Sequence, residues 1–175
     1  IFEQTAATRI LTNKGRVAGV ETDQGVIATD KVLLAGGMWT SCFAKAHGVT
    51  VPLHAAEHFY IVTEPLPDLP KDLPVLNIIE ERTYWKEDAG KLLIGGFEAR
   101  GKAWAQAGIP ENFEFDDLPF DMDHAEPELQ VMYNRMPALA DMGIRTLFNG
   151  PESFTPDGRP YVGPAPELSG LFIAA

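Results

Sequence analysis

The sequence has one cysteine, few basic residues and no long apolar run, and each shortage excludes a class of protein. Cys42 is the only cysteine among 175 residues, so an internal disulfide framework and a zinc site built from cysteines are both excluded. Lysine and arginine total 14 against 25 acidic residues, for a net charge of −11. An anionic surface repels phosphate backbones, so we expect no nucleic-acid partner. The apolar runs are all shorter than the roughly 20 residues that a membrane-spanning helix needs, so we expect no membrane span.

The two ends of the chain lack the marks of a natural terminus. Ile1 is not a start methionine, and the opening Ile1-Phe2-Glu3 has neither the charged segment nor the apolar core of a secretory signal. The chain closes on an apolar run from Leu171 to Ala175 that is typical of a buried strand. We therefore expect an internal fragment of a longer protein. A single thiol fits a reducing compartment, which predicts a cytoplasmic location, or the mitochondrial matrix in a eukaryote.

The chain is expected to consist mainly of short strands, because alternating or continuous apolar patterns recur between turn-forming residues. The predicted strands are residues 2–11, 16–22, 26–29, 32–35, 51–63, 75–79, 83–86, 92–97 and 143–149. The run at 32–35 is continuously apolar, which predicts burial on both faces. Helical spacing predicts helices over 39–47 and 126–139, with Asp123 as the N-cap of the second. This order predicts an α+β or mixed α/β fold with a mostly antiparallel sheet.

The turn residues Glu87-Asp88-Ala89-Gly90 predict a hairpin between the strands at 83–86 and 92–97. Residues 99–124 are irregular and mostly acidic, which predicts an excursion over the surface.

A strand that ends in glycine and is followed by a helix is a candidate ligand-binding turn. Residues 32–40 read VLLAGGMWT, and small residues there let a ligand approach the backbone. The alternative is a turn that requires glycine only for steric reasons. The three-glycine fingerprint of dinucleotide-binding domains is absent from this stretch, and Gly95-Gly96 falls inside a hairpin strand.

Polar and aromatic residues on neighbouring strands form a second candidate site. His58 and Tyr60 are two residues apart, so on a strand they share one face, where they could polarise a substrate or relay a proton. Tyr84 and Trp85 are adjacent, so only one of them can point toward a given pocket, and Glu98 closes the partner strand. The alternative is a half-buried sheet face whose aromatic residues belong to the core.

Two other kinds of active site find no support in the sequence. The histidines at 47, 54, 58 and 124 show no metal-ligand spacing. Ser41, Ser153 and Ser169 lack the context of a nucleophile elbow. We therefore expect neither a metal site nor a serine nucleophile.

Several stretches together resemble the D-amino-acid-oxidase (DAO) superfamily of FAD-dependent oxidoreductases. Residues 16–40 resemble the second half of its FAD-binding domain, and residues 148–175 resemble the segment before its last FAD-binding turn. The stretches 95–104 and 135–168 resemble the dimethylglycine and sarcosine dehydrogenase branch, whose long chains often carry a folate-binding region. The resemblance covers essentially the whole chain, and its most specific part is NGPESFTPDGRP, residues 149–160.

The resemblance implies a division of the chain and a set of functional residues. Residues 1–50 would be the second part of an FAD-binding domain, 51–145 a substrate domain with an antiparallel sheet, and 146–175 a return segment to the FAD-binding domain. The implied catalytic residues are His58 and Tyr84, and the implied substrate-side residues are Tyr60, Trp85 and Glu98. The implied FAD-binding residues are Ala7, Ala35, Gly36, Gly37, Trp39, Pro156 and Asp157, the last two in a loop with Thr155 and Gly158.

The sequence also departs from the family pattern. Ala7 stands where valine is usual. The glycine fingerprint for the FAD pyrophosphate would precede Ile1, and the glycine-rich turn over the flavin would follow Ala175. The histidine that holds FAD covalently in some relatives is absent as well. We therefore expect the chain alone to hold FAD poorly and to be inactive.

The resemblance supports one main hypothesis: the intact protein oxidatively demethylates an N-methylated glycine, dimethylglycine or sarcosine, by hydride transfer to FAD. It implies an electron-transfer partner and, through a further domain, tetrahydrofolate. One alternative is an oxidase of glycine or D-amino acids on the same scaffold. A second is a catalytically silent binding or regulatory module. A third is a piece that associates through exposed sheet edges.

Overall fold

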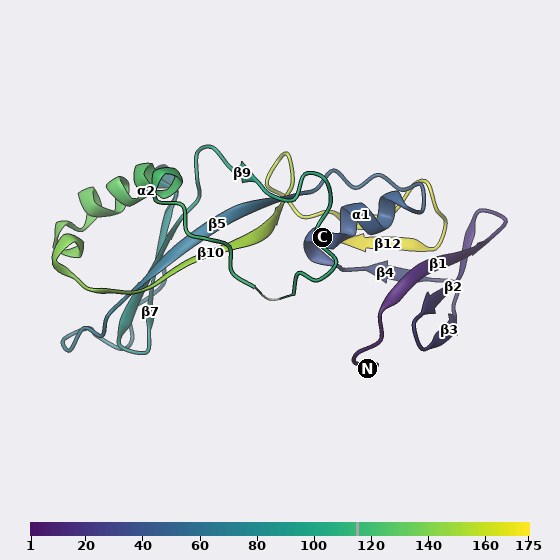
Figure 1. Cartoon of the computed structure of the whole chain (residues 1–175), viewed down its shortest axis with the longest axis horizontal. Coiled ribbons are helices and arrows are strands. Elements are labelled where there is room, and N and C mark those ends of the chain that lie inside the picture. Colours follow the sequence, from purple (N-terminus) through teal and green to yellow (C-terminus); the bar gives the residue numbers. More distant parts are fainter. Residues whose placement is uncertain (115) are drawn as a thin grey trace. The chain divides into compact units, whose positions relative to one another are not determined.

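The computed structural model describes residues 1–114 and 116–175 (Figure 1) and divides the chain into two compact units. Unit 1 comprises Ile1–Ala55, Gln106–Ile109 and Ser153–Ala175, and unit 2 comprises Ala56–Ala105 and Pro110–Glu152. The predicted mixed composition, with mostly antiparallel sheets, is confirmed. The predicted divisions after residues 50 and 145, and the roles assigned to the three parts, stay predictions. In the described ranges, no helix is long and apolar enough to cross a membrane.

Unit 1 contains a meander of three antiparallel strands, β1 (Ala7–Asn13), β2 (Arg16–Thr22) and β3 (Gly25–Ala28). Lys14 and Gly15 both have positive φ, 51° and 75°, as a two-residue hairpin turn requires. The sequence predicts all three strands, but it starts the first at residue 2. The strand begins at Ala7 instead, because Ala7 pairs with Thr22 and β2 ends there.

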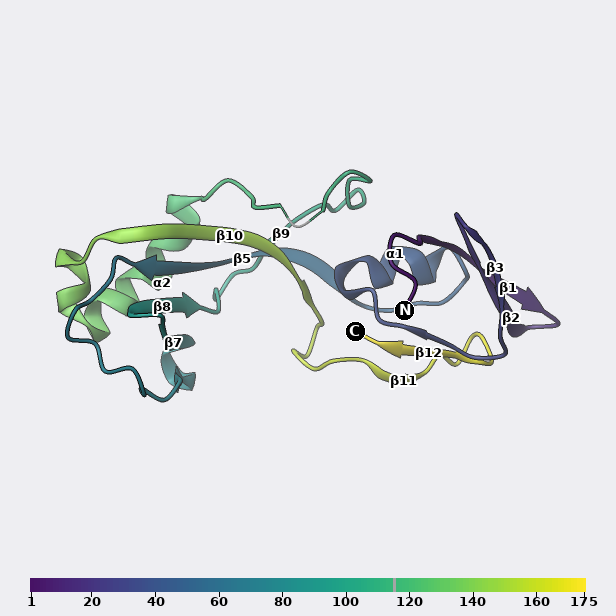
Figure 2. The ribbon, with the colours of Figure 1, turned by 90° about the horizontal axis from the view of Figure 1, so that it is seen from below.

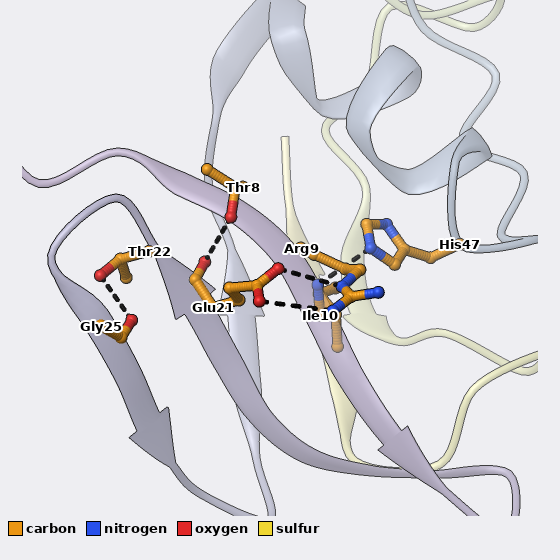
Figure 3. A network of polar contacts seen from close by, with 7 residues as sticks. All are labelled: Thr8, Arg9, Ile10, Glu21, Thr22, Gly25 and His47. Carbon is orange, nitrogen blue, oxygen red and sulfur yellow. Dashed lines mark hydrogen bonds and ion pairs between the residues drawn. The ribbon is translucent and has the colours of Figure 1, made fainter.

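Polar contacts hold this meander together and attach a helix to it (Figure 3). The carboxylate of Glu21 accepts hydrogen bonds from Arg9 Nε and Nη2 at 3.1 and 3.3 Å. His47 follows the short helix α1 (Thr40–Lys45), and its Nε2 accepts the N–H of Ile10 at 2.9 Å. His47 therefore ties α1 to β1, which is a structural role.

A second sheet of unit 1 consists of β4 (Val32–Leu34), β11 (Val162–Pro164) and β12 (Leu171–Ala174) in the order β11-β12-β4. Strand β12 runs parallel to β4 and antiparallel to β11. The prediction that 32–35 is buried on both faces is wrong, because Leu33 is 63% exposed. Successive side chains of a strand point to opposite faces, and only Val32 and Leu34 pack against the core.

Buried apolar side chains from β1, β2, α1, β12 and the connecting loops form the core of unit 1. These are Ile10, Val17, Ala44, Val49, Val51, Leu53, Ala165, Leu168, Leu171 and Ile173. A 3-10 helix, η1 (Gly37–Trp39), leads into α1, so the predicted helix at 39–47 is α-helical only over Thr40–Lys45.

Unit 2 is based on a six-stranded antiparallel sheet in the order β10-β5-β8-β7-β6, with β9 paired to β5. Figure 2 shows β10, β5, β8 and β7 following one another across this sheet. The strands are β5 (His54–Thr63), β6 (Leu76–Ile78), β7 (Thr83–Asp88), β8 (Lys91–Gly96), β9 (Lys102–Ala103) and β10 (Ile144–Phe154). A 3-10 helix, η2 (Ile79–Glu81), joins β6 to β7. The sequence predicts each of these strands except β9.

The hairpin of β7 and β8 turns on two residues, Ala89 and Gly90, whose φ values are 49° and 79°. The turn is shorter than the predicted four residues, because both central residues adopt the left-handed conformation that a tight hairpin needs. This turn sets the register: Tyr84 pairs with Gly95 and Trp85 with Ile94. Tyr84 and Trp85 therefore point to opposite faces of the sheet.

One face of the sheet packs against helix α2 (Met122–Arg135), which is followed by η3 (Pro137–Asp141). Their shared core consists of Phe59, Ile61, Trp85, Leu92, Ile94, Ala125, Leu129, Met132 and Leu139. The N-cap is Asp121 and not the predicted Asp123, because the Asp121 carboxylate accepts the N–H of His124 at 3.1 Å. The helix accordingly begins at Met122, before the predicted residue 126, and ends at Arg135, before the predicted residue 139.

Candidate functional site

The face of the unit 2 sheet that points away from α2 brings three polar side chains together. His58 comes from β5, Tyr84 from β7, and Glu98 lies two residues beyond the end of β8. The side chains of His58 and Glu98 are only 5% and 4% exposed. Two ionisable groups so deeply buried need partners, since burial of an unpaired charge is costly.

Each of these side chains contacts the next. Glu98 Oε2 lies 3.0 Å from His58 Nδ1, and Glu98 Oε1 accepts the N–H of Phe59 at 3.2 Å. An ionised carboxylate can only accept hydrogen bonds, so Nδ1 of His58 carries a hydrogen. His58 Nε2 lies 3.2 Å from the hydroxyl oxygen of Tyr84. The result is a continuous chain of hydrogen bonds, Glu98–His58–Tyr84.

Gly95 makes the last contact of this chain possible. It lies opposite Tyr84 in the hairpin, and a Cβ at residue 95 would stand 2.1 Å from both Cζ and Oη of Tyr84. The phenol ring therefore crosses β8 over Gly95 to reach β5. Its neighbour Gly96 points to the other face, where a Cβ would lie 3.1 Å from Met132 of α2. Gly95 thus permits the contact between Tyr84 and His58 on one face, and Gly96 permits the close packing of α2 on the other.

Aromatic rings surround the hydrogen-bonded chain. Phe97 stacks on His58 with ring centroids 5.2 Å apart and an interplanar angle of 19°. Tyr60 of β5 stacks on Phe148 of β10, with ring centroids 4.6 Å apart and an interplanar angle of 20°. Tyr60 pairs with Gly95, which also pairs with Tyr84, so Tyr60 and Tyr84 share a face.

Burial and the charges of two carboxylates shift the pKa values of His58 and Tyr84. Burial by itself lowers the pKa of His58, but the hydrogen bond and charge of Glu98, with the charge of Glu152, outweigh it and raise the pKa above 6.5. Burial, together with the charges of Glu152 and Glu98, raises the pKa of Tyr84 to about 12. Both groups therefore hold their protons more firmly than in water.

The structure brings together four of the five residues predicted as catalytic or substrate-side, namely His58, Tyr60, Tyr84 and Glu98. Trp85 lies on the other face, in the core under α2, where it is 7% exposed. Its Nε1 donates to Thr83 Oγ1 at 3.1 Å. Trp85 has a packing role, and its predicted substrate-side role finds no support in this position.

The predicted FAD-binding residues lie in three segments of unit 1. Ala7 begins β1, and Ala35 to Trp39 form the turn after β4. Gly37 has φ of 52°, and no atom lies within 4 Å of the place where its Cβ would stand. The space beside the backbone of this turn is therefore open to a ligand, and the contact of these residues with FAD stays a prediction. Trp39 is 44% exposed beside it.

The third segment is the turn that contains Pro156 and Asp157. Asp157 Oδ1 accepts the N–H of Arg159 at 3.2 Å and the hydroxyl of Thr155 at 3.3 Å. Gly158 has φ of 68°. Such a turn favours an Asp carboxylate that accepts from the nearby backbone and a glycine that adopts positive φ, which explains the sequence of this segment. The FAD contact of Pro156 and Asp157 stays a prediction.

Sequence reasoning did not single out Gly95, Phe148 or Glu152 as parts of this face. The two-residue turn at Ala89-Gly90 is the signal that could have revealed Gly95, because it fixes which residue stands opposite Tyr84. The sequence patterns also did not reveal a network on the α2 side of the sheet. Contacts of 2.7 to 3.1 Å join its members, Glu57, Lys102, Asp121 and Asn149. Among the described residues, no group of three or more His, Cys, Asp or Glu side chains could hold a metal ion.

Comparison with known proteins identifies what this chain is similar to. A family model described as FAD dependent oxidoreductase (DAO) matches residues 1–175. The chain is 39% identical to 4-methylaminobutanoate oxidase (formaldehyde-forming) of Paenarthrobacter nicotinovorans, over 100% of this chain and 21% of that protein. It is 37% identical to the mitochondrial sarcosine dehydrogenase of Homo sapiens, over 90% of this chain and 17% of that protein.

One relative is named as a regulatory subunit, whereas the two above are named as an oxidase and a dehydrogenase. The mitochondrial pyruvate dehydrogenase phosphatase regulatory subunit of Mus musculus is 36% identical over 100% of this chain and 20% of that protein. Among solved structures, L-proline dehydrogenase from P. horikoshii aligns with a TM-score of 0.77 and 22% identity, over 99% of this chain and 44% of that chain. The likeness to L-proline dehydrogenase concerns the fold alone. The chain spans about a fifth of the length of 4-methylaminobutanoate oxidase and of the phosphatase regulatory subunit.

Proposed function

We propose that this chain, which belongs to the FAD dependent oxidoreductase (DAO) family, carries the substrate face of an enzyme that oxidatively demethylates an N-methylated amino acid. The observation that carries the proposal is the buried chain Glu98–His58–Tyr84. The names of two relatives, 4-methylaminobutanoate oxidase and sarcosine dehydrogenase, support a methylated amine as the substrate. Dimethylglycine and sarcosine are the candidates we favour.

The cofactor of the family is FAD, which when bound would supply the acceptor for a hydride from the N-methyl carbon of the substrate. The open backbone at Gly37 fits such a group. We propose that Ala35, Gly36, Gly37 and Trp39 lie against FAD, with Ala7, Pro156 and Asp157 as further contacts.

The substrate amine must lose a proton before it can release hydride, because an ammonium nitrogen has no lone pair. In the proposed transfer, the ammonium proton passes to Tyr84 Oη while the hydroxyl proton of Tyr84 passes to His58 Nε2. His58 becomes an imidazolium, which the carboxylate of Glu98 stabilises at Nδ1. The raised pKa of Tyr84, about 12, disfavours a free phenolate, so both proton movements are expected to occur together.

The substrate then leaves as an iminium ion, from which water would release formaldehyde. Transfer of the one-carbon unit to tetrahydrofolate, bound by a further domain, is the other fate that we propose. An electron-transfer partner would reoxidise the cofactor.

Anaerobic reduction of the flavin tests the proposal directly. The experiment uses the intact protein, because this chain alone is expected to hold FAD poorly. The FAD-loaded intact protein is mixed with dimethylglycine, sarcosine, glycine or D-alanine, and the loss of flavin absorbance is followed. We expect reduction by the two methylated amines. Fast reduction by glycine or D-alanine alone would favour an amino-acid oxidase on the same scaffold.

A regulatory role is a second candidate, which the 36% identity to a phosphatase regulatory subunit favours. The same experiment separates the two candidates. A protein that binds FAD but is reduced by none of the four amines would support the regulatory role.

A further inference from the structure

Strand β10 presents residues to the His58 face that the proposed proton transfer does not use. Asn149 of this strand is 4% exposed, and its Nδ2 donates to Glu57 Oε2 at 2.7 Å and to the carbonyl of Pro119 at 2.9 Å. Glu57 alternates with His58 along β5 and lies on the opposite face. Phe148 and Gly150, the neighbours of Asn149, therefore lie on the His58 face of the strand. Glu152, two residues beyond Gly150, lies on the same face.

Phe148 is held in place from two directions. Its ring stacks on Tyr60 of β5 at 4.6 Å. A Cβ at Gly150 would stand 2.7 Å from the Phe148 ring, so the ring lies along its own strand over Gly150. Tyr60 and Phe148 are both half-buried, and they form a fixed aromatic wall beside the hydrogen-bonded chain.

Glu152 lies four residues beyond Phe148 on β10, in the same phase of the strand. Its side chain is exposed, and its charge acts on both His58 and Tyr84. The carboxylate of Glu98, by contrast, is engaged with His58 and the N–H of Phe59. Of the two carboxylates whose charges act on His58 and Tyr84, Glu152 is therefore the one that a cationic ligand can approach.

The combination suits one kind of cation. Methyl groups on an ammonium nitrogen remove hydrogen-bond donors and spread the charge, and such ions bind to the faces of aromatic rings. An unmethylated ammonium group instead requires several hydrogen-bond acceptors. An aromatic wall with one nearby carboxylate favours the methylated ion.

We propose that Tyr60, Phe148 and Glu152 bind the methylated ammonium group of the substrate and determine the preference for methylated over unmethylated amines. This inference rests on the proposed function, because it assigns the ligand of the same face. Tyr60 and Phe148 contact the methyl groups, and Glu152 compensates the positive charge. The proton transfer to Tyr84 then follows from a substrate held in this position.

Trimethylglycine is a probe that separates binding from reaction. It carries a methylated ammonium group and a carboxylate, but it has no N–H, so it cannot lose a proton to Tyr84. Calorimetric titration of the FAD-loaded intact protein measures the affinity for trimethylglycine without any catalytic turnover. Acetate, which has the carboxylate alone, is the matched ligand control.

Three variants test the assignment. We expect Phe148→Leu to weaken trimethylglycine binding about tenfold and Glu152→Gln about fivefold, with acetate affinity unchanged. Phe148→Tyr keeps an aromatic ring and is expected to keep the affinity, which excludes a general loss of folding. Glu126→Gln removes an exposed carboxylate on α2 and is expected to have no effect.

Unchanged trimethylglycine affinity in Phe148→Leu and Glu152→Gln would overturn the inference, as would an equal loss of acetate affinity. The outcome is distinct from a failure of the proposed function. If no methylated amine reduces the flavin but both variants lose trimethylglycine binding as expected, the binding site stands and the proposed reaction falls.

Discussion

The phenol ring of Tyr84 lies over Gly95, its partner across the β7–β8 hairpin, so closely that a Cβ at residue 95 would stand 2.1 Å from the hydroxyl oxygen. The hydroxyl thereby reaches His58 Nε2 on the next strand, at 3.2 Å. Gly95 thus controls the geometry of the site through the position of the Tyr84 ring.

Gly95→Ala is expected to displace the Tyr84 ring and to break its contact with His58. Misplacement of a reacting group by about 1 Å can lower a rate about 100-fold, so we expect a loss of that size in the rate of flavin reduction. Stopped-flow absorbance of the FAD-loaded intact protein measures this rate. The matched control is Gly96→Ala, which crowds Met132 of α2 and should lower stability rather than the rate. The opposite pattern would contradict this account of the glycine pair.

Adjacent residues on β7 are expected to respond in opposite ways. Tyr84→Phe removes the hydroxyl that relays the proton, so we expect the rate of flavin reduction to fall about 100-fold with little change in stability. Trp85→Ala leaves a cavity in the core under α2 and should lower the free energy of unfolding by about 3–5 kcal/mol. Urea unfolding and stopped-flow kinetics of both variants provide the measurement. A large kinetic loss in Trp85→Phe, which keeps the packing, would show that Trp85 faces the substrate after all.

The Glu98–His58 pair predicts that stability falls as pH rises above 6.5. The pKa of His58 is raised in the folded protein, so above 6.5 the folded state binds more protons than the unfolded state, until the pH passes the folded pKa. In this window the free energy of unfolding decreases with pH. Below 6.5 the stabilisation is complete, because His58 is protonated in both states.

Glu98→Gln tests this linkage. It removes the hydrogen-bonded charge and leaves burial, the largest influence, which lowers the pKa of His58 against the smaller opposing effect of the Glu152 charge. We expect the decrease in stability between pH 6.5 and 9 to disappear in the variant, as followed by urea unfolding at several pH values. Glu126→Gln serves as the control. A variant whose stability declines with pH as steeply as the wild type would rule out this pair as the source.

Local patterns in the sequence predict much of this fold. The alternation of RVAGVET places β2 at residues 16–22, and spacing by two residues places His58 and Tyr60 on one face. Adjacent positions separate Tyr84 from Trp85, but they do not tell which of the two faces the core. That choice depends on the packing of α2, whose Leu129 and Met132 cover the Trp85 face.

Contacts between residues far apart in sequence could not be predicted in this way. His58 and Glu98 are 40 residues apart, and Glu57 and Asn149 are 92 apart, so only the folded sheet brings them together. The N-cap depended on geometry as well: Asp121 and Asp123 are equally suitable residue types, and the position of the chain decides between them. The predicted burial of Leu33 is wrong, because a continuous apolar run shows hydrophobicity but not which faces of the strand are covered.

The central claim is that His58 accepts, through Tyr84, the proton that the substrate ammonium loses. The pH dependence of anaerobic flavin reduction in the wild type and in His58→Gln tests it most directly. In the wild type we expect the rate to increase with pH through the raised pKa of His58, because only neutral His58 can accept a proton. In His58→Gln we expect this increase to be lost and the rate to be about 100-fold lower. An unchanged rate and an unchanged pH profile in His58→Gln would contradict the claim.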